Sequence, residues 1–517
     1  MSETMTDSAM ASKVKKGLAW STINSLALRA GSFAVGILLA HLLAPKEFGV
    51  FAVALTVQSI IVTLADPGIS VDLIRNGDVE RRAATTTTLA LMVSGVLAVI
   101  MAVFAGPVSS ALGSGEAAPV VRVMAFTLLL SGLSTVPYAK MQREFRQSAQ
   151  LAVDATTLIV NVLVILVLVP LGMGAMALAV ARVVSQGCAC VLQFALTKSL
   201  PSIGFNRDIA RGVLKFGIPL ASANLLAWIV LNVDYMVVGS TAGAVVLGFY
   251  TLAFNISSWP LNSLGTAIRS VALPAFSQLG DAGRQLSGFL AATALGWAAA
   301  LGVGVGLSGL AMVLITLVYG EKWEPATAAL AGLAFFGALR VIFDLAATFL
   351  IAKGSSKSIL FLQAGWLILL VPAMAVGTRQ WGLAGAGWAH VVVAAVAIAP
   401  MYFFALRRHG IRLGPVLRQL IVPALCAALS LGVGLPLIHH LSNRFVALFV
   451  GGAVLLLLYA VPMLPWLRGR LRDLKAAAAA APAPEPEPLP SLDETVEFAR
   501  IPPQSGDPRQ QPTTAEI

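Results

Sequence analysis

The chain has 517 residues, of which 58% are hydrophobic and only 11% are charged. Soluble domains carry about 25% charged residues, so this composition excludes an ordinary soluble protein. The net charge of +11 does not indicate nucleic acid binding, because the basic residues lie in short loops between apolar runs and form no continuous face. The composition therefore predicts an all-α membrane protein that contacts membrane lipids and no nucleic acid.

Apolar runs of about 20 residues, long enough to cross the hydrocarbon core of a bilayer, recur along almost the whole chain. We expect about fourteen membrane-spanning helices, with boundaries good to about two to four residues. They cover roughly residues 17–41, 46–66, 84–106, 119–138, 151–170, 173–196, 213–238, 246–270, 288–318, 326–351, 358–376, 382–404, 416–438 and 444–465.

The lysines and arginines of the loops are confined largely to alternate loops. If the N-terminus is cytoplasmic, every inner loop carries Lys or Arg, and the outer loops hold only Lys46, Lys322, Arg379 and Arg444. Because Lys and Arg concentrate on the cytoplasmic side of a membrane protein, both termini are predicted to be cytoplasmic. Residues 1–16 would then form a short cytoplasmic N-terminal segment.

The C-terminal segment differs in composition from the rest of the chain. An alanine run leads into an Ala-Pro-Glu-Pro stretch, and the last residues are polar and rich in proline. Such a segment buries too little apolar surface to fold by itself. We predict residues 466–517 to be a disordered cytoplasmic tail.

An internal repeat relates the two halves of the membrane region. Residues 48–51 (Phe-Gly-Val-Phe) at the start of the second span match residues 247–250 (Leu-Gly-Phe-Tyr) at the start of the eighth. Six spans separate them, so the two halves have the same orientation, and a pseudo-twofold axis along the membrane normal would relate them. The repeat predicts two six-helix lobes plus two extra helices. The N-terminal lobe would cover 17–200, the C-terminal lobe 205–405 and the two additional helices 416–465.

Polar residues within the spans follow single helical faces. They are costly in lipid and normally face the interior of a helix bundle or water. Tight helix packing explains the Ser, Thr and Gly positions, but it gives no reason to bury the guanidinium groups of Arg29 and Arg269. We therefore predict a hydrated central cavity between spans one, two, seven and eight. Its uncharged polar candidates are Ser25, Asn224, Asn232, Asn255 and Asn262.

Three further charged groups have two interpretations each. Arg340 and Asp344 are four residues apart on the tenth span. Either they form a local ion pair that neutralises itself, or Asp344 is released from Arg340 during the transport cycle and then binds a cation or a proton. Arg182 has no carboxylate partner in its own helix, so pairing in the cavity or between the lobes stays open. The ion-coupling candidates are Asp344, Asp234 and Asp66.

No metal or cofactor site is predicted. The five histidines form no metal-ligand pattern such as HExxH, and no GxxxxGK[ST] sequence is present for binding ATP.

Five short segments together resemble a known family. They are 42–51 (Leu-Leu-Ala-Pro-Lys-Glu-Phe-Gly-Val-Phe), 66–70 (Asp-Pro-Gly-Ile-Ser), 142–146 (Gln-Arg-Glu-Phe-Arg), 233–239 (Val-Asp-Tyr-Met-Val-Val-Gly) and 273–277 (Leu-Pro-Ala-Phe-Ser). In order and spacing the chain resembles the polysaccharide flippases, in the polysaccharide transporter branch of the multidrug/oligosaccharidyl-lipid/polysaccharide exporter superfamily. The resemblance covers roughly residues 13–410.

The resemblance implies a transporter rather than an enzyme, with two six-helix lobes in a V around a central cavity. The implied substrate is an undecaprenyl-pyrophosphate-linked oligosaccharide repeat unit. It would move from the cytoplasmic to the outer leaflet of a bacterial inner membrane, for exopolysaccharide or lipopolysaccharide biosynthesis. Alternating access would be driven by an ion gradient or the membrane potential, and polysaccharide polymerase or export machinery is a candidate partner.

On this hypothesis the arginines bind the pyrophosphate. Guanidinium groups suit phosphate oxygens in a bidentate way, which assigns Arg29 and Arg269, together with Arg182 and Arg340, to the headgroup. With the repeat offset of 199 residues, Trp228 corresponds to Arg29, so the two halves do not contribute the same charge to the cavity. No cation site of the family can be assigned to residues of this chain by motif. A peptidoglycan-precursor lipid flippase and a multidrug exporter of related fold remain alternatives.

Overall fold

The computed structural model describes residues 31–479, except residues 32, 66–68, 71–72, 74–78, 145, 200–201 and 279–281. For residues 266–278 and 282–285 it describes the backbone alone. Every regular element within these residues is a helix, as the apolar runs predict, because only helices and closed barrels satisfy their backbone groups in lipid. The chain divides into two units, Met1–Leu467 and Arg468–Ile517.

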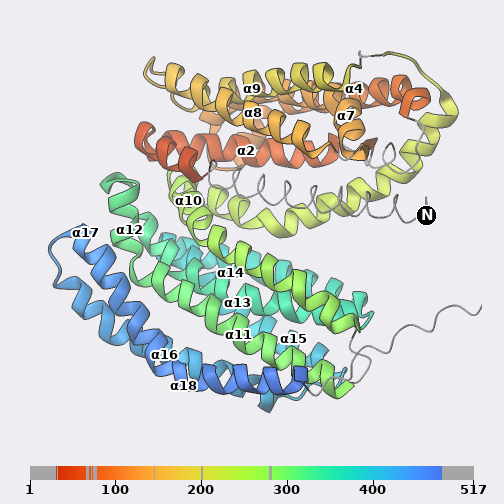
Figure 1. Cartoon of the computed structure of the whole chain (residues 1–517). Helices are drawn as coiled ribbons and strands as arrows, with labels where there is room; N and C mark the ends of the chain where they lie inside the picture. The colour runs from red at the N-terminus through yellow and green to blue at the C-terminus, as the bar shows by residue number, and fades with distance from the viewer. Residues whose placement is uncertain are drawn as a thin grey trace, which may run out of the picture. The chain divides into compact units, whose positions relative to one another are not determined.

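The described part of the N-terminal half includes a short apolar helix, Phe33–Leu42, which precedes α2 (Pro45–Ala65). The long helices of this half are α2, α4, α7, α8 and α9 (Figure 1), with α8 packed on α9 and α7 packed on both α4 and α9. The elements are α2 (Pro45–Ala65), α4 (Val79–Val103), α5 (Ala105–Ala111), the 3₁₀ turn η1 (Gly115–Ala117), α6 (Ala118–Met124), α7 (Phe126–Arg143), α8 (Gln147–Leu168) and α9 (Gly174–Thr197).

The longest helix, α10 (Arg207–Gln278), turns sharply within its length. Gly243 has φ 81° and ψ 176°, a backbone conformation that glycine adopts without the steric cost a Cβ would bring. The turn separates the predicted seventh and eighth spans, which the sequence places at 213–238 and 246–270. Helix α10 contacts both α2 in the N-terminal half and α13 in the C-terminal half.

The C-terminal half is arranged around α13, which contacts α10, α11 and α14. Helix α14 turns at Gly382, where φ is 58°, between the predicted eleventh and twelfth spans. The elements are α11 (Ala282–Gly309), α12 (Ala311–Val318), the 3₁₀ turn η2 (Glu321–Trp323), α13 (Ala326–Ala352), α14 (Ser356–Val393), the π-helical η3 (Ala394–Ile398) and α15 (Ala399–Arg407).

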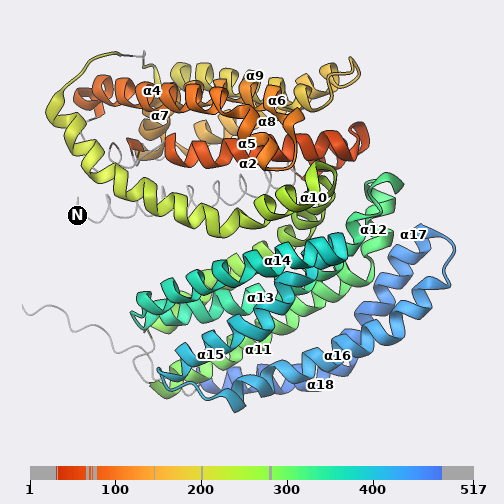
Figure 2. The same cartoon turned by 180° about the vertical axis from the view of Figure 1, so that it is seen from behind.

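The last helices are α16 (Leu413–His439), α17 (Arg444–Val446), the π-helical η4 (Ala447–Gly451) and α18 (Gly452–Ala479). Figure 2 shows α16 and α18 side by side, with α11 as their neighbour. Two hydrogen bonds, one of them buried, join them to α11. Tyr459 donates to the carbonyl of Ala298 at 2.7 Å, and Trp297 donates to that of Leu420 at 3.0 Å.

Twelve helical segments within the described residues are long and apolar enough to cross a membrane. One of them, Lys357–Arg407, contains the turn at Gly382 and corresponds to two predicted spans. The first predicted span, 17–41, lies mostly outside the described residues. The chain is thus an all-helical, multi-pass membrane protein, as predicted, while the count of fourteen spans stays a prediction.

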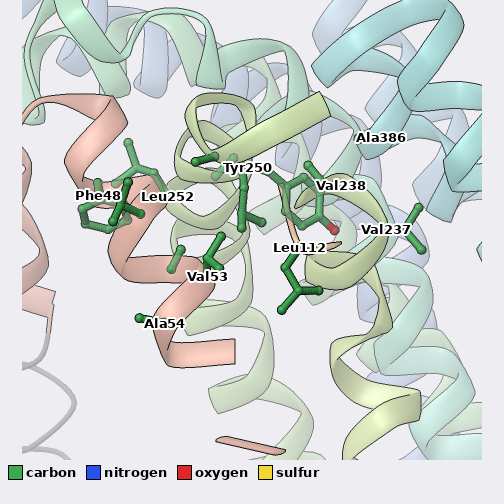
Figure 3. Packing of buried hydrophobic residues seen from close by; sticks show 14 of the residues in the cluster. Phe48, Val53, Ala54, Leu112, Val237, Val238, Tyr250, Leu252 and Ala386 are labelled. Atoms are coloured by element: carbon green, nitrogen blue, oxygen red, sulfur yellow. The ribbon is translucent and has the colours of Figure 1, made fainter. Parts of the chain in front are cut away.

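The largest apolar core joins the two halves. Figure 3 shows Phe48 and Val53 of α2 close to Tyr250 and Leu252 of α10, with Ala386 of α14 nearby. All five side chains are at least 91% buried. Helices α2 and α10 therefore meet through a packed apolar surface at the positions where the repeat motif occurs in each half.

Candidate functional site

A polar cavity of 160 Å³ lies within the C-terminal half, among α10, α13, α14 and α15. We call it the C-half cavity, and its polar character comes mainly from Asp234, Arg340, Asp344, Gln363 and His390. Most of its walls are aromatic or aliphatic, and a few ionisable groups face one another across it. Its lining residues are Leu231, Asp234, Phe254, Phe336, Arg340, Phe343, Asp344, Leu362, Gln363, Trp366, Leu370, His390 and Tyr402.

Two of the lining residues, Asp234 and His390, are joined behind the cavity wall by hydrogen bonds to a third side chain, Tyr250. The hydroxyl of Tyr250 donates to Oδ2 of Asp234 at 2.8 Å. The same hydroxyl oxygen lies 2.9 Å from Nε2 of His390, which comes from α14, 140 residues further along the chain. Asp234 and His390 are each 3% exposed, and Tyr250 is fully buried. Three separate spans thus contribute one group each to a buried polar chain.

With Asp234 ionised, the hydrogen-bond pattern assigns the protons of these three side chains. A tyrosine hydroxyl has one proton, and because it is donated to Asp234, the Tyr250 oxygen accepts from Nε2–H of His390. Nδ1 of His390 and Oδ1 of Asp234 are buried and have no hydrogen-bond partner among the described residues. Buried polar atoms without a partner are costly, so both ends of the chain are places where a proton, a cation or water can bind.

Aromatic rings pack against the hydrogen-bonded side chains of Asp234, Tyr250 and His390 and against the opposite side of the cavity. Phe336 packs on the imidazole of His390 with centroids 4.5 Å apart, and Tyr235 meets Tyr250 edge to face at 5.9 Å. Phe343 stacks on Tyr402 at 5.0 Å on the far wall. These contacts restrict the rings and surround the ionisable groups with apolar surface, which strengthens electrostatic interactions inside the cavity.

Arg340 and Asp344 bring a cation and a second carboxylate to the same cavity. Both are half-buried on α13 and also line a smaller adjoining pocket with Ser257, Ser258 and Asn262 of α10. Asp234, Arg340 and Asp344, which the sequence singles out on the seventh and tenth spans, therefore converge on one place. Asn262 faces the adjoining pocket.

Other predicted residues do not line this cavity. Arg182 on α9, Asn224 and Asn255 are exposed. Asn232 is half-buried, and its amide donates to the carbonyl of Trp228 in its own helix at 2.9 Å. Ser25, Arg29 and Asp66 lie outside the described residues, and of Arg269 only the backbone on α10 is described. The predicted central cavity between spans one, two, seven and eight stays a prediction.

Sequence reasoning missed His390 and Tyr250 as functional candidates. His390 fits no metal motif, and Tyr250 stands out in the sequence only as part of the repeat. A signal is nevertheless present, because an ionisable side chain within an apolar span is by default a functional candidate. Within the described residues, no three His, Cys, Asp or Glu side chains gather as a metal site.

Comparison with known proteins identifies relatives along most of the chain. The chain is 24% identical over 481 residues to the succinoglycan biosynthesis transport protein ExoT of Rhizobium meliloti, covering 91% of this chain and 96% of that protein. It is 22% identical over 400 residues to the lipopolysaccharide biosynthesis protein WzxC of Escherichia coli, covering 76% and 81%. The teichuronic acid biosynthesis protein TuaB of Bacillus subtilis is 22% identical over 388 residues, covering 74% and 80%.

Solved structures share the fold. The lipid II flippase MurJ in an inward closed conformation superposes with a TM-score of 0.70 at 14% identity, over 89% of this chain and 100% of that one. An inward-facing multidrug resistance transporter of the MATE family gives a TM-score of 0.58 at 18% identity, over 76% and 98%.

The family described as "Polysaccharide biosynthesis protein" matches residues 38–328, which is more than half of the chain. This match confirms the family resemblance that the sequence motifs indicate. The protein belongs to this family of polysaccharide biosynthesis proteins.

Proposed function

We propose that the protein is a flippase that moves an undecaprenyl-pyrophosphate-linked oligosaccharide repeat unit from the cytoplasmic to the outer leaflet of a bacterial inner membrane. The observation that carries this proposal is the family match over residues 38–328, in a chain whose described residues contain twelve candidate spans. Relatives named for succinoglycan transport and lipopolysaccharide biosynthesis support it. Both termini would be cytoplasmic, and the chain would transport its substrate without altering it covalently.

We further propose that a proton drives the cycle through the C-half cavity. A proton that binds Nδ1 of His390 lets Nε2 pass its proton to the Tyr250 oxygen, while the Tyr250 hydroxyl proton passes to Oδ2 of Asp234. The net result is one proton moved from His390 to Asp234. Arg340 lines the same cavity, and neutralising Asp234 would remove a nearby negative charge and so favour binding of a phosphate to the Arg340 guanidinium. Asp344 is the second candidate for the coupling group, and Asp66 is the third.

The headgroup assignment is tested by alanine at Arg29 and at Arg269. We expect either substitution to abolish export, because each removes a guanidinium that the sequence places on the cavity face of its span. Arg412→Ala, at an exposed arginine just before α16, is the matched control and should export normally. Polysaccharide yield per unit of membrane-inserted protein is the measurement. Normal export from both Arg29→Ala and Arg269→Ala would contradict the assignment.

Depleting the protein tests the function as a whole. We expect surface polysaccharide to fall while a completed repeat unit accumulates on its polyprenyl lipid, as measured by mass spectrometry of the lipid-linked pool. Accumulation of a peptidoglycan precursor instead would favour the lipid II alternative. An unchanged pool and unchanged polysaccharide, in cells without a second flippase, would contradict the proposal, and transport of small cations would then test the exporter alternative.

A further inference from the structure

The turn η2 of the C-terminal half caps the end of a helix in the N-terminal half. The ammonium of Lys322 donates to the carbonyls of His41 and Leu43, at 2.9 and 2.8 Å. The indole N–H of Trp323 donates to the carbonyl of Ala40 at 2.8 Å. These partners are about 280 residues apart in sequence, so three directed hydrogen bonds join the two halves at this point.

The capped carbonyls lie where a helix ends and needs acceptor partners. The last carbonyls of a helix have no partner within it. In a continuing helix the amide of Ala44 would bond to Ala40, but here it donates to the carboxylate of Glu47 at 3.0 Å instead. The Ala40 carbonyl is therefore left for the indole. A cation at the C-terminal end of a helix is also favoured by the helix dipole, which suits Lys322.

Trp323 is fully buried although it lies in a turn between spans. Its ring meets Phe48 of α2 edge to face, with centroids 5.2 Å apart, and Phe249 of α10 in the same way at 5.8 Å. Phe48 and Phe249 belong to the two copies of the repeat motif. The indole thus fills the space between the starts of the two repeat-related helices.

The repeat motifs also touch each other directly, and the contact is reciprocal. A Cβ at Gly49 would overlap the carbonyl oxygen of Ala244, and a Cβ at Gly248 would lie 2.6 Å from the carbonyl oxygen of Pro45. With the repeat offset of 199 residues, Gly49 corresponds to Gly248 and Pro45 to Ala244. Each glycine therefore packs on the partner that symmetry predicts, as in an isologous interface.

We infer that Lys322 and Trp323 form a latch that closes the outer entrance between the two halves. Both residues lie on the same side of the membrane region as Lys46. The distribution of Lys and Arg among the loops predicts that this side is the outer one. The glycine contact allows the backbones to meet, and the three hydrogen bonds hold them together. Opening toward the outer leaflet must break these bonds and expose the indole of Trp323. The inference extends the proposed alternating-access function by assigning residues to one of its gates.

A reporter cysteine measures whether the latch is closed. With Cys188, Cys190 and Cys426 replaced by serine, Thr251→Cys places a thiol one turn beyond the start of the eighth span. Thr251 is 8% exposed and its hydroxyl has no partner among the described residues, so the change removes no hydrogen bond. Labelling by a membrane-impermeant maleimide added outside intact cells then reports outward opening.

We expect Lys322→Met and Trp323→Phe each to raise the labelling rate several-fold. Methionine removes the ammonium donors at similar length, and phenylalanine removes the indole N–H while keeping an aromatic ring between Phe48 and Phe249. Lys322→Arg should be labelled as slowly as the parent, because arginine keeps a cationic hydrogen-bond donor at this position. Lys46→Met is the matched control, since Lys46 pairs with Glu116 of its own half at 2.8 Å, and its labelling should equal that of the parent.

Two results would overturn the latch. One is parental labelling in both Lys322→Met and Trp323→Phe, and the other is an equal rise in Lys46→Met. Labelling that increases only from the cytoplasmic side would overturn the outer placement. The assay uses no substrate, so its outcome bears on the latch even if depletion shows that the cargo is not a lipid-linked oligosaccharide.

Discussion

Asp234→Asn should abolish ion-driven flipping and leave a folded protein in the membrane. Asparagine has the shape of aspartate and can still accept the hydrogen bond from Tyr250, which lies 2.8 Å away, but it cannot take up a proton. Proton-driven transport should fall by at least about 100-fold, the scale on which a positioned proton-transfer group acts. The measurement is flipping of lipid-linked substrate into proteoliposomes with and without a proton gradient.

The controls separate loss of coupling from loss of structure. Asp208→Asn removes a carboxylate from the exposed start of the same helix and should transport normally. Tyr250→Phe should slow transport. Tyr459→Phe is its control: the Tyr459 hydroxyl is also buried and donates to a carbonyl at 2.7 Å, but it lies outside the C-half cavity, so transport should stay normal. Gradient-dependent transport by Asp234→Asn at the parental rate would exclude Asp234 as the coupling group and leave Asp344 and Asp66.

Alanine at Gly49 or Gly248 should also stop transport, for a steric reason. The added methyl group meets backbone oxygen of the opposite half, at Ala244 and Pro45 respectively, and backbone cannot rotate away as a side chain can. Overpacking of this kind costs about 1–3 kcal/mol, which lowers the population of the closed conformation about 5- to 150-fold. Export should fall, and outside labelling of Thr251→Cys should rise.

Gly212→Ala is the matched control for these substitutions. Gly212 also lies on α10, but its added methyl would have no atom within 4 Å, so export and labelling should stay at parental values. Protein abundance and thermal stability are measured in parallel. We expect export by Gly49→Ala and Gly248→Ala to fall by a larger factor than the amount of protein in the membrane. Full-rate export by both Gly49→Ala and Gly248→Ala would show that this backbone contact is not needed for transport.

The sequence predicts the fold well because its signals are local. Apolar length marks each span, and a glycine marks each tight turn, as Gly243 and Gly382 do in the two longest helices. Breaks within spans are harder to predict. The predicted ninth span, 288–318, is divided into α11 and α12 at Leu310, directly after a glycine-rich stretch, residues 302–309, whose apolar character hid the break.

The candidate site is only partly predictable, because it depends on which helices pack together. Asp234, Arg340 and Asp344 stand out as charges in apolar spans, yet nothing in the sequence says that they line one cavity. His390 reaches Tyr250 only because α14 turns at Gly382 and packs on α10. The hydrogen bonds from Lys322 to the carbonyls of His41 and Leu43 cannot be predicted from the sequence either, because every residue has a backbone carbonyl.

The reciprocal contact of Gly49 with Ala244 and of Gly248 with Pro45 has an evolutionary meaning. A surface that packs on its own symmetry equivalent is what two identical chains need to form a closed pair. A six-helix chain with this motif would have the surface to pair in parallel with a copy of itself, so the predicted repeat is what duplication and fusion of one such gene would leave. The two halves now differ in their polar groups. The C-terminal half holds the hydrogen-bonded Asp234, Tyr250 and His390, and the N-terminal half supplies the carbonyls that the latch caps.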